Sequence, residues 1–290
     1  MWEAMGLEMG ATLALAAGAF PVVAAIAFAR LGSAHVWDAA QVYHKPDEYG
    51  EQKRWKGPIR TRFNAWTSLA YCEAGSYILH DIACRLLRPP QNCGDVYWHW
   101  HVMFGASLTW TGVASFLFHA SLTERWRALD AGATMGVTFF PAALCIYRAL
   151  RANGWEPYER ACFALAVLGW AYCHRLAQTP GWSDAVLISN LVGQLILEWT
   201  ALASYKEDYD TRAWTIYTCV MLFGVSLRAC DVEVEKWRLK GWPSLGQRMT
   251  FLTSIAWLGH SAWHILTSAG IVVLVSRSTD IVEPFCVPPH

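Results

Sequence analysis

The sequence predicts an all-α protein, a polytopic membrane helical bundle with seven core transmembrane helices and an extra hydrophobic helix at the N-terminus. Three observations predict this class. Hydrophobic residues make up 54% of the 290 residues and charged residues only 16%, whereas a soluble domain carries about 25% charged residues. Apolar runs recur that are close to the roughly 20 residues with which a helix crosses a bilayer. The 17 tryptophans and 11 tyrosines are typical of a protein whose aromatic rings lie at both membrane interfaces.

The first 61 residues precede the predicted core. Residues 1–34 are expected to form a hydrophobic helix or a signal segment, since Met9–Ala29 is apolar and small residues follow it. Glu3 and Glu8 stand where a signal peptide carries basic residues, so a retained helix is favoured. Residues 35–61 are polar and contain proline and glycine, and they are predicted to form a loop.

The predicted seven-helix membrane domain covers residues 62–276, and residues 277–290 form a short C-terminal tail. Its spans are predicted from the apolar runs at 63–87, 98–120, 127–150, 158–176, 183–205, 211–230 and 251–275. Several runs contain a charged residue, for example Glu73, Arg175 or Arg228. Charged side chains inside membrane helices usually face the bundle, so a polar interior is expected.

Two pairs of polar residues share a four-residue spacing. Ser115 and His119 are one pair, and His260 and His264 are the other. Residues four apart lie on one face of a helix, one turn from each other. Because lipid offers no hydrogen bonds, such residues are expected to point into the bundle.

The order of crossings predicts that these pairs lie at one membrane depth. The span with His119 ends at the same face at which the next span, containing Asp130, begins, and the last span begins there as well. If one span had been miscounted, the histidine pairs would lie about 30 Å apart. The topology therefore permits a single site made of Ser115, His119, Asp130, His260 and His264.

Three histidines with an open fourth position are a common ligand set of catalytic zinc. We expect His119, His260 and His264 to bind zinc, which would activate a water molecule as a nucleophile. Asp130 is predicted to accept a proton from the water and return it to the leaving group. Ser115 is predicted to orient the water or stabilise the developing oxyanion. This chemistry suits hydrolysis of an amide or ester of a lipid.

Several motifs resemble those of the alkaline ceramidases, within the CREST superfamily of seven-span membrane hydrolases. One is Gly-x-x-Ser-x-x-x-His at 112–119, with Asp130 eleven residues after the histidine. Another is Leu258–Thr267, similar to the family's His-x-x-Trp-His-Ile-Leu segment, and a third is Asn64–Tyr71, similar to its Asn-Thr-x-Ser-Asn-Leu opening. The resemblance covers about residues 60–275.

The resemblance implies an integral, multi-pass zinc amidase of the endoplasmic reticulum or Golgi membrane that cleaves ceramide into a sphingoid base and a fatty acid. Animal members also have a calcium site with a glutamate just before the Asn-Thr, where this chain has Thr61. Calcium is therefore not predicted. The family places its metal site on the lumenal side of the membrane. In this chain, the loops at the face with the predicted site are rich in basic residues, which favours the cytosolic side under the positive-inside rule.

Two alternatives remain open from the sequence. One is a related lipid ester or GPI-anchor-remodelling hydrolase, and the other is a seven-helix protein resembling the adiponectin/progestin receptors, with structural zinc. The expected partners are the lipid bilayer and a ceramide-like lipid. The chain carries 23 basic and 23 acidic residues, and this balance does not favour nucleic acid as a partner. No oligomeric state is predicted.

Overall fold

A computed structural model describes residues 2–33, 35–43, 51, 53–86, 98–152, 158–179, 185–186, 188–190, 192–193, 195–196, 211–239 and 258–278. This part of the chain is all-α, as predicted. Its helices are α1 (Trp2–Leu31), α2 (Arg62–Ser68), α3 (Ala70–Leu86), α4 (Trp98–Ser121), α5 (Glu124–Ala152), α6 (Glu159–Leu176), α8 (Thr211–Leu239) and α11 (Gly259–Ser278).

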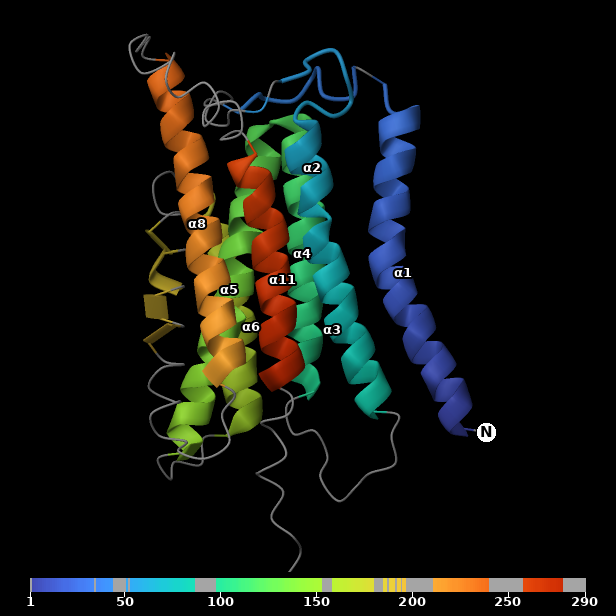
Figure 1. The fold of residues 1–290 in the computed structure, drawn as a ribbon. Helices are drawn as coiled ribbons and strands as arrows, with labels where there is room; N and C mark the ends of the chain where they lie inside the picture. Colours follow the sequence, from blue (N-terminus) through green and yellow to red (C-terminus); the bar gives the residue numbers. More distant parts are fainter. Residues whose placement is uncertain are drawn as a thin grey trace, which may run out of the picture.

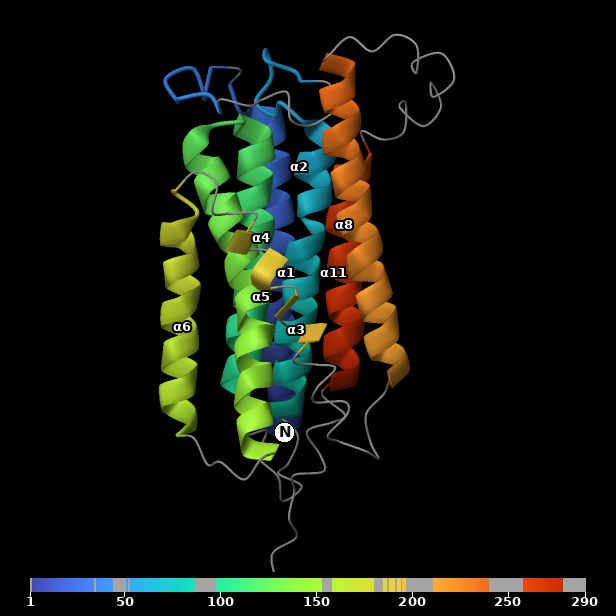
Figure 2. The same cartoon turned by 90° about the vertical axis from the view of Figure 1, so that its left-hand side faces the viewer.

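The long helices stand side by side in one bundle (Figure 1). Neighbours in sequence pack as neighbours in space: α3 on α4, α4 on α5, and α5 on α6. The last helix, α11, packs on α8, α3 and α2, while α1 packs mainly on α3. Figure 2 shows α6 and α8 at opposite edges, with α5 between them. The fold thus brings α11 beside the helices that follow the predicted loop.

Most apolar runs became helices with closely similar bounds. The run 98–120 matches α4 and the run 158–176 matches α6, while α5 and α8 extend beyond the apolar parts that predicted them. The run 63–87 is divided at Leu69 into α2 and α3. The run 183–205 falls largely outside the described residues.

One helical stretch in the described part, His99–Ser121, is long and apolar enough to cross a bilayer by length and composition. Gly18–Leu31 is a shorter apolar stretch. The seven-span arrangement goes beyond this finding and stays a prediction. In α1, Gly18 lies against Ser76 of α3, so α1 packs on the bundle.

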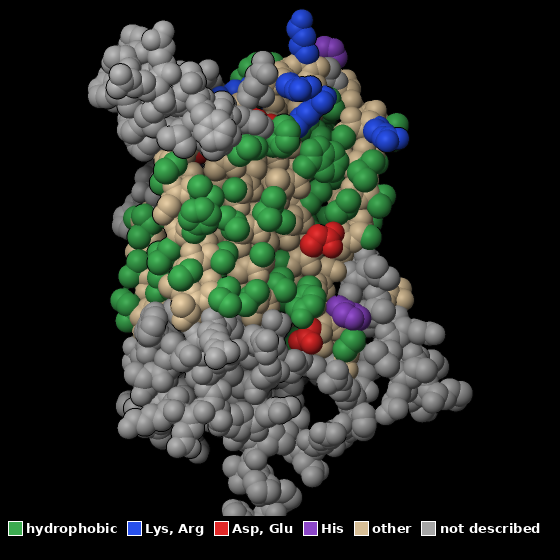
Figure 3. Space-filling view, viewed as in Figure 1, with side chains coloured by type: hydrophobic (Ala, Val, Ile, Leu, Met, Phe, Trp, Pro, Cys, Tyr) green, Lys and Arg blue, Asp and Glu red, His purple; other side chains and the backbone are tan. Residues whose placement is uncertain are grey.

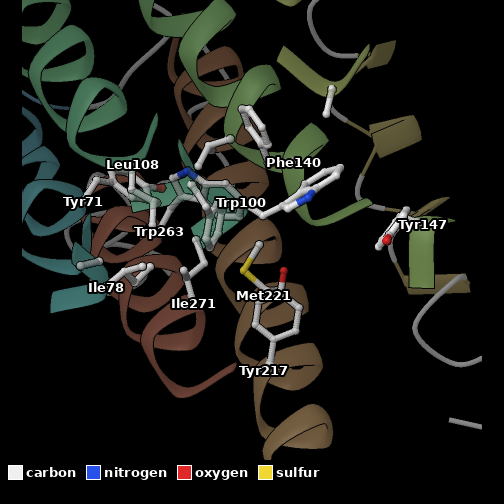
Figure 4. Packing of buried hydrophobic residues seen from close by; sticks show 14 residues of the cluster. Tyr71, Ile78, Trp100, Leu108, Phe140, Tyr147, Tyr217, Met221, Trp263 and Ile271 are labelled. Carbon is white, nitrogen blue, oxygen red and sulfur yellow. The ribbon is translucent and has the colours of Figure 1, made fainter. Parts of the chain in front are cut away.

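The largest group of buried apolar side chains lies between α3, α4, α5, α8 and α11. Trp100, Leu108 and Phe140 are buried in it, together with Trp263 from the last helix (Figure 4). Side chains on the outside are apolar as well, on α1, α6 and α8: Phe20, Val23, Leu165, Leu168, Tyr172, Ile216, Leu222 and Phe223. Figure 3 shows hydrophobic side chains over the described middle of one face, with Lys and Arg near the end where α2 and α11 begin.

The segment before α2 caps the C-terminal end of α4 with hydrogen bonds. The backbone N–H of Thr61 donates to the His119 carbonyl and that of Arg60 to the Ala120 carbonyl, each at 3.0 Å. The Arg60 guanidinium donates to the carbonyl of Ser121. These donors satisfy carbonyls that a helix leaves unpaired in its last turn. The predicted loop is therefore attached to the helix that carries His119.

Glu51 caps the start of α2. Its carboxylate accepts hydrogen bonds from the backbone N–H groups of Phe63, at 2.7 Å, and Asn64, at 2.9 Å. Burial raises the pKa of the Glu51 carboxyl, and these hydrogen bonds oppose that shift. A negative group at a helix N-terminus is stabilising because it meets the unpaired N–H groups and the helix dipole.

A very short turn joins α4 to α5. Leu122 has a left-handed backbone conformation, with φ of 47°, which residues other than glycine rarely adopt. Its N–H donates to the Phe118 carbonyl and its carbonyl accepts from the N–H of Tyr43. The chain therefore reverses direction three residues after His119.

Gly259, at the start of α11, lies directly against α8. A Cβ atom at this position would collide with the carbonyl oxygen of Leu227 and lie 3.3 Å from the Cβ of Asp231. We therefore expect Gly259→Ala to separate the two helices and to lower the free energy of unfolding by about 1–3 kcal/mol. Thermal unfolding in detergent measures the effect. Gly193→Ala is the control, because a Cβ at Gly193 would meet no atom of the described residues within 4 Å. An equal loss in both variants would contradict the explanation.

Candidate metal centre

Three histidine side chains meet where α4 ends and α11 begins. Nε2 of His119 and Nε2 of His260 are 3.1 Å apart. One ring nitrogen from each of His119, His260 and His264 can be chosen so that all three lie within 4.8 Å of one another. The predicted convergence of the three histidines is confirmed.

Helix geometry explains how two helices supply three converging rings. His260 and His264 are one turn apart on α11, and their ring centroids are 4.6 Å apart. His119 faces both of them from α4, with centroid distances of 4.9 Å and 5.4 Å. All three side chains are buried, with at most 5% exposed. Such a cluster needs polar partners, because apolar surroundings cannot satisfy imidazole nitrogens.

Hydroxyl groups surround the rings on the side of α2. The Thr61 hydroxyl lies 3.4 Å from Nδ1 of His119. The Thr67 and Ser68 hydroxyls lie 3.1 Å and 3.4 Å from Nδ1 of His264. The spacing of these three residues in the sequence had indicated no role for them at the site.

Ser115 and Asp130 are linked to the histidines through hydroxyl groups. Ser115 is 2% exposed and its hydroxyl is 3.1 Å from the Ser68 hydroxyl. A side-chain hydrogen bond also joins Ser115 to the carboxyl group of Asp130. Ser68 in turn lies beside His264, so hydroxyls connect Asp130 to the histidine cluster.

Arg127 and Arg228 both lie within electrostatic range of Asp130. Arg228 of α8 interacts with all three histidines and with Asp130. In the sequence, Arg228 is recognisable only as a charge inside an apolar run. Asp231, one turn further along α8, is 1% exposed and lies beside Gly259. The neighbourhood of the site is therefore strongly polar, although the bundle around it is apolar.

Other histidines of the described chain lie apart from this cluster. His99, at the opposite end of α4, has its Nε2 2.7 Å from the carboxylate of Glu159. Twenty residues of helix separate it from His119, a distance of about 30 Å along the axis. His174 of α6 accepts a hydrogen bond from the indole N–H of Trp110. Neither of these two histidines belongs to the metal-type cluster.

Four acidic residues lie between α1 and α2 in the sequence: Asp38, Asp47, Glu48 and Glu51. Glu51 caps α2, and Asp38 accepts from the exposed His35 ring at 2.7 Å. Asp47 and Glu48 lie outside the described residues.

The donor set fits a transition metal. In a tetrahedral site with zinc–nitrogen bonds of about 2.0–2.1 Å, two ligand nitrogens stand roughly 3.3 Å apart, close to the 3.1 Å between the Nε2 atoms of His119 and His260. Nitrogen ligands suit zinc, copper, iron and nickel. The histidine group could therefore hold a metal ion, whose identity the geometry leaves open.

Comparison with protein-family models, with curated proteins and with solved structures gives no significant match for this chain.

Proposed function

We propose that this protein is a membrane-embedded, zinc-dependent amidase that hydrolyses the N-acyl bond of ceramide or a related sphingolipid. The observation that carries the proposal is the buried cluster of His119, His260 and His264, with Ser115 and Asp130 beside it. The resemblance of its motifs to the alkaline ceramidases supplies the substrate class.

The ion would be held by the three imidazoles. Zinc bound by three histidines would lower the pKa of a water molecule towards neutrality and polarise the substrate carbonyl. Three neutral nitrogen ligands leave a fourth position for that chemistry, whereas a structural site is usually closed by a fourth protein ligand.

Asp130 would transfer the proton, and Ser115 would stabilise the negative charge that develops on the carbonyl oxygen. Asp130 accepts a proton from the attacking water and later donates it to the nitrogen of the leaving sphingoid base. Ser115 hydrogen-bonds the carboxylate of Asp130. Once Asp130 has taken up the proton it can donate to Ser115, whose own hydrogen is then free to donate to the carbonyl oxygen as it becomes negative. The reaction consumes one water and releases one amine and one fatty acid.

The surface of the bundle supports a lipid environment. Large apolar side chains are exposed on α1, α6 and α8, and three of them, Phe20, Leu165 and Leu168, are 64–73% exposed. Extended exposed apolar surface marks sites of interaction with a membrane or a partner. A bilayer around the bundle would cover these side chains and bring a two-chain lipid to the helices that bear the histidines.

The deciding experiment incubates purified protein with a panel of N-acyl sphingolipids and lipid esters and measures the products by mass spectrometry. We expect equimolar sphingoid base and fatty acid from the zinc-loaded protein, loss of both products on chelation, and recovery with added zinc. Release of fatty acid from esters alone would favour the ester or GPI-anchor-remodelling hydrolase. Tight zinc binding without any lipid turnover would contradict the enzyme proposal and favour a receptor with structural zinc.

A further inference from the structure

We infer that Thr61, Thr67 and Ser68 are positioning residues of the metal centre. Their hydroxyl groups accept hydrogen bonds from the Nδ1–H groups of His119 and His264 and so direct Nε2 of both rings at the ion. This inference rests on the metal centre of the proposed function and adds to it the residues that set which nitrogen binds. All three hydroxyls come from one eight-residue stretch.

The hydrogen of the Thr61 hydroxyl already has an acceptor. Thr61 Oγ1 donates to the carbonyl oxygen of His119 at 2.7 Å, and a hydroxyl has only one hydrogen to donate. Nδ1 of His119 lies 3.4 Å from the same oxygen. The ring must therefore donate to Thr61, which places the ring hydrogen on Nδ1 and leaves the lone pair on Nε2.

The same argument holds independently for His264. Thr67 Oγ1 donates to the Phe63 carbonyl at 2.8 Å, and Ser68 Oγ donates to the Asn64 carbonyl at 2.6 Å. Nδ1 of His264 lies 3.1 Å and 3.4 Å from these two oxygens. Since both hydroxyl hydrogens are committed to the helix backbone, the Nδ1–H of His264 is the donor, and Nε2 is left for the metal.

The geometry at the centre agrees with this assignment. Nε2 of His119 is the atom that lies 3.1 Å from Nε2 of His260, so the nitrogen freed by Thr61 faces the neighbouring ligand. Metal-ligating histidines commonly donate their second N–H to an outer partner, which fixes the ring and its tautomer. The hydroxyl-bearing residues are themselves held in place beside the histidines. The backbone N–H of Thr61 donates to the His119 carbonyl, and Glu51 caps the start of α2, the helix that carries Thr67 and Ser68.

The test measures zinc affinity by competition with a chelator, using full-length protein. Thr61→Val removes the hydroxyl next to Nδ1 of His119, and the double variant Thr67→Val/Ser68→Ala removes both hydroxyls next to Nδ1 of His264. We expect each to weaken zinc binding about 10- to 100-fold, whereas Thr67→Ser, which keeps a hydroxyl, stays within about threefold of the wild type. The matched control is Thr111→Val, because the buried Thr111 hydroxyl also donates to a carbonyl one turn away, that of Ser107 at 2.9 Å, about 12 Å along α4 from His119.

A second measurement uses the unaltered protein and so does not depend on how the variants fold. Nitrogen-15 NMR of labelled histidines in the zinc-loaded protein should show Nδ1 protonated and Nε2 bound to the metal in His119 and His264. Wild-type affinity in the valine variants, or zinc on Nδ1 of either ring, would overturn the inference while leaving the metal centre in place. Failure of the wild-type protein to bind zinc would overturn the metal centre as well.

Discussion

Replacing His260 with alanine is expected to abolish both zinc binding and lipid hydrolysis. His260 supplies one of three buried imidazoles, and its Nε2 lies 3.1 Å from that of His119. Two remaining nitrogens cannot retain the ion at ordinary zinc concentrations. Because the metal contributes several kcal/mol to stabilising the transition state, turnover should fall at least roughly a thousandfold. Metal analysis of the purified protein and mass spectrometry of released sphingoid base measure the two effects.

His99→Ala is the matched control for this substitution. His99 lies at the other end of α4 and pairs with Glu159, so its loss should leave both zinc content and turnover close to the wild type. Chelated wild-type protein should behave like His260→Ala. Full turnover in a His260→Ala protein that has lost its zinc would show that the reaction does not need the metal.

Asp130→Asn is expected to lower the maximal rate while leaving zinc bound. The amide has nearly the shape of the carboxyl group but cannot take up a proton from water or return it to the amine. Proton transfer by a positioned side chain contributes about 10²–10⁴-fold to a rate, so kcat should fall by at least about a hundredfold. In the wild type, the rate should rise with pH as Asp130 and a metal-bound water become deprotonated, and the variant should lose the part of this rise that belongs to Asp130. Steady-state kinetics across pH, with zinc content measured in parallel, test both points.

Glu159→Gln is the control for a carboxyl-to-amide change elsewhere in the bundle. Glu159 binds His99 and the Trp100 indole, and the variant should keep its pH profile. Loss of zinc from Asp130→Asn would instead mean that Asp130 supports the metal site. An unchanged kcat would exclude it as the proton carrier.

The sequence predicted those features that depend on local spacing. Apolar runs of membrane length predicted α4 and α6 almost to the residue. The four-residue spacing of His260 and His264 placed two rings on one face of α11, and counting crossings brought His119 to the same end. The apolar pattern was less accurate for α8, because a helix can continue through polar residues after its apolar face ends.

The hydroxyl partners of the histidines could not be predicted in this way. Thr67 and His264 are 197 residues apart, and nothing in the spacing of either segment specifies which helix packs on which. The place of Arg228 beside the site was missed for the same reason, since a charge in an apolar run predicts a polar bundle interior but not which side chains of other helices it meets. Threonine is also frequent at the N-cap of helices that bind no metal, so Thr61 by itself did not indicate a metal site.

The way the three histidines are divided between helices has a consequence for folding as well as for chemistry. His119 belongs to α4, whereas His260 and His264 belong to α11, which packs mainly on α8, α3 and α2. A bound ion would therefore cross-link two elements whose ligands are 141 residues apart in sequence. Closing so long a loop restricts the unfolded chain, and anything that binds only the folded state stabilises it. The metal would then stabilise the folded bundle as a cross-link between α4 and α11. Metal-loaded protein should therefore resist heat and protease better than chelated protein, even in a variant such as Asp130→Asn that turns over little lipid.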